Sequence, residues 1–346
     1  MLGHLTRTAD LGKYGVKRLL LSSAVIFGLL LIIFTISRVL IPDPARAWAG
    51  KGASQVSVDA IRVQFHLNDP LYLQFFYYLS DLFHGNLGID PITGLPVTYE
   101  IGVFFPATFE LTMTAFIMTL LVGAVLGVSA AVHRNKLGDH AARVISLSGV
   151  ATPPFLGAMV LQLVFFYYLG LVADSGGEIS ALIHQPAHIT GMLVVDCLIT
   201  GNWPALMSAL QHLILPSVAL AFLTIGAMSR LVRASMLEAL SSDYIRTVRA
   251  KGVARTLVIY KHALKNALAQ PLTAMGVYLA FLLGGSVVVE NIFSWPGIGR
   301  FTAQAALSFN LPAVMGVTIV DALVVIIANL LADICVAILD PRIVLK

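Results

Sequence analysis

Long apolar segments dominate this chain and restrict it to a membrane protein. A helix needs roughly 20 apolar residues to cross a bilayer, and six segments reach that length. They cover residues 19–41, 104–132, 144–172, 209–231, 268–289 and 313–339. Only 12% of the 346 residues are charged, against about 25% in an ordinary soluble domain. We therefore expect an all-α membrane protein with six transmembrane helices.

The first apolar segment could be confused with a secretory signal. It follows a basic start, and Ala45-Arg-Ala47 looks like a cleavage site. An apolar signal region is usually about 7–15 residues long, and residues 19–41 exceed that. The sequence therefore predicts an uncleaved first transmembrane helix.

The positions of the basic residues predict the orientation of the chain. Most Lys and Arg residues fall in four places, which are residues 1–18, 134–143, 230–265 and 340–346. Residues 173–211 contain neither Lys nor Arg. Loops rich in these residues stay in the cytoplasm. We therefore predict a cytoplasmic N-terminus (1–18), a cytoplasmic loop (232–267) and a cytoplasmic tail (340–346).

The remaining segments complete the predicted organisation. Residues 42–103 are too polar to cross and contain several aromatic residues and a turn-rich run, so we expect a small extracytoplasmic subdomain with one or two helices. Residues 104–339 would form a five-helix core. The apolar run 188–200 is too short to span and predicts an interfacial or half-buried helix.

Sequence motifs for catalysis are absent. The chain has no G-x-x-x-x-G-K-[ST] phosphate loop and no H-E-x-x-H, G-x-S-x-G or C-x-x-C motif. His184 and His188 are four residues apart, but Pro186 between them disfavours a helical metal site. We therefore predict a chain that is not an enzyme and that holds no metal or cofactor.

The cytoplasmic loop contains a short helix with clear boundaries. Ser241, Ser242 and Asp243 offer side chains that could cap its first turn. Gly252 can adopt the left-handed conformation that ends a helix. A helix of about two turns is marginal alone, so the helix 243–252 should need a surface to pack on. A second helical stretch, 255–269, follows it.

The order of features in this loop resembles a known family. The run Asp243-Tyr-Ile-Arg-Thr-Val-Arg-Ala-Lys-Gly252, followed by His262-Ala-Leu264, is similar to the ATPase-docking EAA loop of binding-protein-dependent ABC importers. Gly252 and Leu264 match the family pattern, but its Glu and Pro are missing. That departure resembles the dipeptide, oligopeptide and nickel permeases of the "B" type. Further segments agree, namely 85–88, 105–112, 212–216, 293–299 and 340–342.

This resemblance implies the permease subunit of a type I ABC importer in the cell (inner) membrane. The implied partners are a second, homologous permease, two ATP-binding subunits that hold ATP and Mg²⁺, and an extracytoplasmic substrate-binding protein. Di- or oligopeptides would be the cargo. A nickel chelate, an oligosaccharide and, more distantly, a secondary transporter are the alternatives. The implied ATPase-docking residues are Asp243, Tyr244, Arg246, Arg249, Lys251 and Gly252.

Two features inside the apolar segments stand out. Asp321 lies deep in the sixth segment, and an intramembrane carboxylate usually faces protein or water. It is a possible pathway residue, although a position near the headgroups would also explain it. Gly123 and Gly127 form a G-x-x-x-G step that predicts close helix packing.

Overall fold

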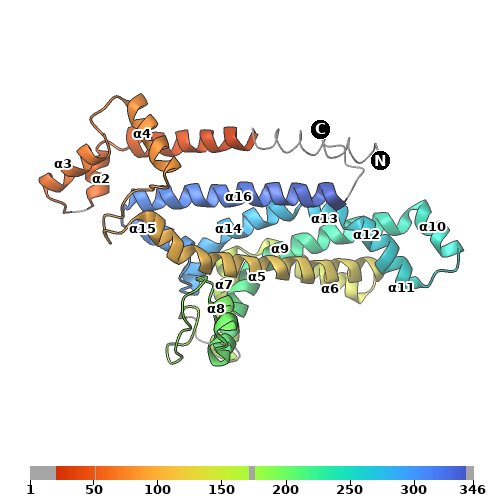
Figure 1. Cartoon of the computed structure of the whole chain (residues 1–346). Coiled ribbons are helices and arrows are strands. Elements are labelled where there is room, and N and C mark those ends of the chain that lie inside the picture. The colour runs from red at the N-terminus through yellow and green to blue at the C-terminus, as the bar shows by residue number, and fades with distance from the viewer. Residues whose placement is uncertain (1–20, 51, 171–175, 340–346) are drawn as a thin grey trace. The chain divides into compact units, whose positions relative to one another are not determined.

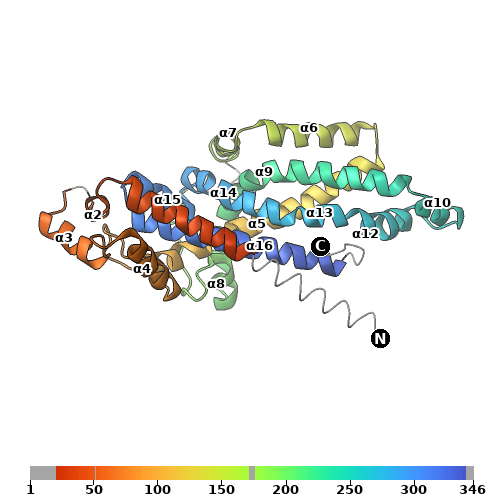
Figure 2. The same ribbon diagram turned by 90° about the horizontal axis from the view of Figure 1, so that it is seen from above.

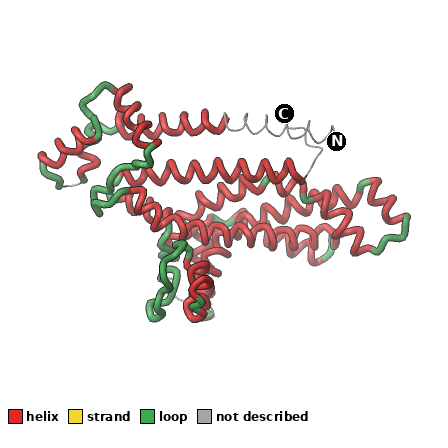
Figure 3. The backbone as a smooth tube through the Cα atoms, viewed as in Figure 1, coloured by secondary structure: helices red, strands yellow, loops and turns green. Residues whose placement is uncertain are grey.

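The structure is a computed structural model that describes residues 21–50, 52–170 and 176–339 (Figure 1). The predicted cytoplasmic segments 1–18 and 340–346 lie outside these residues. Helices joined by loops make up the described part of the chain, and no named strand occurs in it (Figure 3). The chain forms two compact units. Among the described residues, the first contains those up to Pro106 and Pro296–Ile326, and the second contains those from Ala107 to Trp295 and from Ile327 onward.

In the part of the chain that the structure describes, five single helices are long and apolar enough to cross a membrane. They are Leu21–Leu40, α5 (Val97–Val132), α9 (Trp203–Ser241), α14 (Met275–Ile292) and the Leu311–Leu331 part of α16 (Leu311–Leu339). The predicted span 144–172 corresponds to a pair of helical segments, Leu137–Gly149 and Pro154–Tyr168, which together are long and apolar enough to cross a membrane but are bent by 111°. Pro153 and Pro154 lie at the break, where proline disfavours helical continuation from the preceding residue.

The helices also differ from the predicted limits at their ends. At about 1.5 Å per residue, the 39 residues of α9 are far longer than the roughly 30 Å hydrocarbon core. The helical hydrogen bonds continue into the polar residues on either side of the apolar segment, and a hydropathy profile does not mark these residues as helical. The fifth span also starts later than predicted, because α13 (Ala269–Thr273) precedes α14 as a separate short helix.

Three helices, not one or two, lie between the first span and α5. They are α2 (Pro44–Ala49), α3 (Gln55–Gln64) and α4 (Leu71–Phe83). Asp43 caps α2 by accepting from the Arg46 amide at 3.3 Å, and it pairs with Arg62 of α3 at 3.1 Å. One contact thus both starts a helix and joins it to the next.

The core of the first unit comes from both of its sequence segments. Val97 and Ile101 of α5 are buried against Phe301 of α15 (Ile298–Leu307) and Val317 of α16. A second apolar cluster joins Phe34, Tyr78 and Ile319. Segments far apart in sequence therefore make one folding unit.

The second unit is built around α9. Its core includes Leu111, Leu220, Leu282 and Trp295, and the Trp295 indole donates to the Ala107 carbonyl at 3.0 Å. The helix α6 (Leu137–Ala151) runs beside α9 (Figure 2). The predicted short helix appears as α8 (Leu193–Thr200).

Small residues allow these helices to approach closely. A Cβ atom added at Gly123 or Gly127 of α5 would lie 2.7 Å or 2.6 Å from the side chains of Met228 or Val232 of α9. The close packing predicted from the G-x-x-x-G step is therefore confirmed. Gly149 of α6 likewise leaves no room for a Cβ, which would fall 2.6 Å from the Phe222 carbonyl oxygen.

Candidate functional site

The short helix of the polar loop is α10 (Asp243–Ala250), and it follows directly on α9. Its N-cap is Ser242, but the serine side chain makes no capping hydrogen bond. The Ser242 hydroxyl instead donates to the Ala239 carbonyl at 2.5 Å. The end of α9 supplies unpaired carbonyl groups, and these compete for the hydroxyl. The predicted side-chain cap is therefore absent, although the helix starts where expected.

The end of α10 depends on Gly252. Its φ angle is +75°, in the left-handed region, where a side chain is disfavoured. Its amide donates to the Arg249 carbonyl at 2.9 Å, and the Lys251 amide donates to the Thr247 carbonyl at 3.2 Å. No atom lies within 4 Å of a Cβ added at Gly252. Backbone conformation, not space, makes glycine the suitable residue.

One side chain anchors α10 to the rest of the second unit. Ile245 is fully buried, in a cluster with Val128, Met236 and Val258. This packing supplies the surface that a helix of two turns requires. The returning chain is helical over Arg255–Ala267, but its middle, Val258–Ala263, is a π-helix. The predicted second helical stretch is thus present, with a wider turn inside it.

The opposite face of α10 is exposed and charged. Asp243 and Arg246 pair at 3.2 Å, with their side chains 94% and 75% exposed. The structure places all six residues of the predicted docking set, Asp243, Tyr244, Arg246, Arg249, Lys251 and Gly252, on the exposed side of this loop. Beside α10 lies a cavity of about 580 Å³, whose lining includes Arg134, Arg249 and Arg255. The helix therefore combines one apolar anchor with a basic, accessible face.

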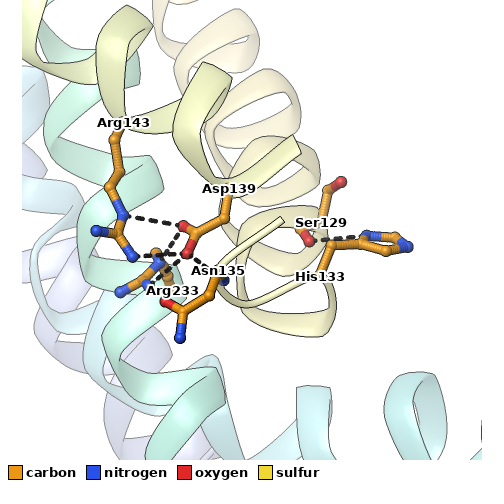
Figure 4. A network of polar contacts seen from close by, with 6 residues as sticks. All are labelled: Ser129, His133, Asn135, Asp139, Arg143 and Arg233. Carbon is orange, nitrogen blue, oxygen red and sulfur yellow. Dashed lines mark hydrogen bonds and ion pairs between the residues drawn. The ribbon is translucent and has the colours of Figure 1, made fainter. Parts of the chain in front are cut away.

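A buried carboxylate joins α6 to α9 near this loop (Figure 4). Asp139 is fully buried and accepts two hydrogen bonds from Arg233 of α9, at 2.8 and 2.9 Å. It accepts two more from Arg143 of α6, at 3.1 and 2.6 Å, and one from the Asn135 amide at 3.0 Å. Charge-assisted pairs of this kind are the strong hydrogen bonds of proteins. Together with the Gly149 contact, they make α6 and α9 a closely joined pair.

Sequence reasoning missed this network. In the sequence, Arg143 and Arg233 serve only as basic residues that predict a cytoplasmic side, and no motif marks Asp139 as their partner. The available signal was the spacing of Asp139 and Arg143, which places them on one helical face at i and i+4. The Arg233 contact crosses 94 residues, and no local pattern reports it.

Buried carboxylates within the second unit were also missed. Glu110 accepts from the Val194 amide at 2.9 Å, and Glu290 accepts from the Thr108 hydroxyl at 2.7 Å. Burial, with these two carboxylates nearby, raises the pKa of Glu178 to about 8. Carboxylates inside apolar segments were a usable signal. Asp321, predicted from that rule, lies partly buried on α16 in the first unit.

Comparisons with known proteins cover most of the chain. Residues 123–345 match the family described as the binding-protein-dependent transport system inner membrane component. Residues 12–93 match the N-terminal part of such membrane components. Both matches agree with a helical protein of several membrane spans.

Three relatives are similar along nearly their full length. The probable D,D-dipeptide transport system permease protein DdpB of Escherichia coli (strain K12) is 41% identical, over 92% of this chain and 94% of the relative. The dipeptide transport system permease protein DppB of Alkalihalophilus pseudofirmus is 37% identical, over 95% and 98%. The glutathione transport system permease protein GsiC of Escherichia coli (strain K12) is 34% identical, over 96% and 98%.

Proposed function

The chain belongs to the family of binding-protein-dependent transport system inner membrane components, and from this membership we propose that it forms half of a transmembrane pathway for short peptides. As a family member it is a multi-pass membrane permease of an ABC importer. It works with ATPase and substrate-binding partners and is not itself the enzyme.

The proposed peptide cargo rests on the similarity to permeases named for D,D-dipeptide, dipeptide and glutathione transport. The similarity extends over at least 92% of this chain in each case, so it is not confined to one shared motif. A nickel chelate or an oligosaccharide is the competing cargo within the same family.

The proposed complex contains a second, homologous permease, two ATP-binding subunits and an extracytoplasmic binding protein. ATP and Mg²⁺ would bind the ATP-binding subunits, because this chain has no phosphate loop. The two permeases would enclose the pathway. Residues 42–103 would face outward, near the binding protein, and Asp321 is a proposed pathway residue.

We infer that α10 couples the ATPase to the membrane helices. Its exposed residues Asp243 and Arg246 would contact an ATP-binding subunit, while the buried Ile245 fixes the helix to the bundle. Force on α10 would pass to α9, and through Asp139 and Arg233 to α6. Rigid helices that move together allow a small shift at one end to change access at the other.

The cargo can be tested on the binding protein that partners this permease. We expect its unfolding temperature to rise in the presence of short peptides, because a ligand that binds only the folded state stabilises it. Nickel chelates and oligosaccharides serve as comparison ligands in the same assay. A rise with a nickel chelate or a sugar, and none with peptides, would contradict the peptide cargo but not the family.

The orientation can be tested by labelling single cysteines in intact cells. The background carries Cys197→Ala and Cys335→Ala, and the reporters are Ser57→Cys in α3 and Ser241→Cys before α10, both exposed positions. An impermeant maleimide should label position 57 in intact cells and position 241 only after permeabilisation, as the distribution of basic residues requires. The reverse pattern would overturn the proposed orientation.

A further inference from the structure

A small cavity in the first unit is lined by buried hydrogen-bond donors. Its volume is about 40 Å³, and its lining includes Arg38, Trp48 and Tyr78. Arg38 lies in the last turn of the first membrane helix, Trp48 lies in α2 and Tyr78 lies in α4. Three separate elements therefore meet at this cavity. On a comparable measure, a water molecule needs roughly 10–15 Å³, so the cavity has room for one small ion or for a few water molecules.

Arg38 brings a positive charge to the cavity, where the Asp81 carboxylate interacts with it electrostatically but forms no ion pair with it. Its guanidinium lies 4.2 Å from the centre of the Trp48 ring, and its Nη1 donates to the Phe65 carbonyl at 3.2 Å. Contact with a ring uses the face of the guanidinium, so the N–H groups at its edge must find other acceptors, and Nη1 uses the Phe65 carbonyl. The buried Nε has no acceptor among the described residues.

Two neighbouring side chains are unpaired in the same way. Trp48 is only 3% exposed and Tyr78 only 9% exposed. Neither the indole Nε1 of Trp48 nor the Tyr78 hydroxyl has a partner among the described residues. Burial raises the pKa of Tyr78 to about 12, so its hydroxyl keeps its proton. A buried donor without a partner costs about 1–3 kcal/mol, and three lie around one cavity.

Donors of this number and type require an acceptor. Arginine and indole N–H groups can only donate, so a further donor would not satisfy them. A monovalent anion supplies an acceptor for all three groups and also neutralises the partly buried guanidinium. Uncompensated buried charge is costly, and this favours an anion over a neutral water molecule.

We propose that Arg38, Trp48 and Tyr78 form a binding site for one small monovalent anion, halide or carboxylate in size. The anion would join the end of the first membrane helix to α2 and α4. This site is separate from the proposed coupling helix and does not depend on the cargo. Its predicted effect is on the stability of the extracytoplasmic subdomain.

Asp81 is the competing explanation for the unpaired charge. Its carboxylate also lines the cavity, but it is exposed and accepts from Asn86 at 3.4 Å. If Asp81 turned inward, it would take the place of the anion. The two explanations differ in whether the wild type itself responds to an added anion, so the wild type is compared with Asp81→Asn.

The test uses the intact transporter complex with chloride as the probe. Its unfolding temperature is measured while chloride replaces gluconate at constant ionic strength. We expect a saturable rise in the wild type. Trp48→Phe and Tyr78→Phe should each raise the half-saturating chloride concentration about tenfold, as loss of one hydrogen bond to a charged group implies. Asp81→Asn should keep the response or strengthen it.

Two further variants make the same substitutions, Tyr→Phe and Trp→Phe, at positions away from the cavity and serve as matched controls. Tyr72→Phe changes an exposed tyrosine of the same helix, α4, and Trp203→Phe changes an exposed tryptophan of the second unit. Both should respond to chloride like the wild type. The proposal fails if the wild type shows no saturable response, or if Trp48→Phe and Tyr78→Phe keep the wild-type half-saturating concentration. It also fails if only Asp81→Asn responds to chloride.

Discussion

Asp139→Asn is expected to lower the stability of the permease by about 3 kcal/mol, because removing one partner of a buried ion pair leaves the other charge uncompensated. Asp139 is fully buried between Arg143 and Arg233. Arg233 is only 21% exposed, so water cannot fully replace the lost contact. The unfolding temperature of the purified complex measures the effect.

A second carboxylate provides a control for this substitution. Asp59 pairs with Arg62 at 3.2 Å, but its side chain is 57% exposed. Exposed pairs contribute at most about 1 kcal/mol, so Asp59→Asn should shift the unfolding temperature much less. Equal shifts for Asp59→Asn and Asp139→Asn would show that the buried network does not hold α6 to α9.

The helical class and the positions of the spans could be predicted from the sequence because each depends on local properties. An apolar run of sufficient length makes a span wherever it occurs, and Gly252 ends α10 through its own backbone conformation. The bend at Pro153 was less predictable. Proline signals a break, but the 111° angle depends on what the two segments pack against.

The long-range contacts could not be predicted in the same way. Asp139 and Arg233 come together only because Gly149 and Gly226 bring α6 and α9 close. The cap of α10 failed as a prediction because the Ser242 hydroxyl donates back to the Ala239 carbonyl at the end of α9 and makes no capping bond. Such choices are decided by the geometry of neighbouring elements.

Gly252→Val is expected to reduce transport about tenfold, because the left-handed conformation costs an L-residue roughly 1–2 kcal/mol and 1.4 kcal/mol is a tenfold shift in population. The φ angle at this position is +75°, and a β-branched residue fits it poorly. The end of α10 would shift, and its exposed face would turn away from the ATPase. Uptake of labelled peptide into proteoliposomes measures the loss.

Two substitutions control for effects unrelated to this conformation. Gly252→Asn should retain most activity, because asparagine tolerates the left-handed region. Gly138→Val changes another glycine that has free space around it but no positive φ angle, and it should leave transport nearly unchanged. If Gly138→Val were as harmful as Gly252→Val, added bulk at an exposed glycine would explain the loss.

The central claim, that α10 couples this permease to its ATPase, is tested most directly by ATP hydrolysis in the reconstituted transporter. Hydrolysis is measured with and without the loaded binding protein, for the wild type, Gly252→Val and Arg246→Glu. Arg246 is 75% exposed on α10, so its reversal should alter the docking face and leave the bundle folded. We predict that both variants insert normally but lose most of the stimulation by the binding protein. Wild-type stimulation in both variants would contradict the coupling role of α10.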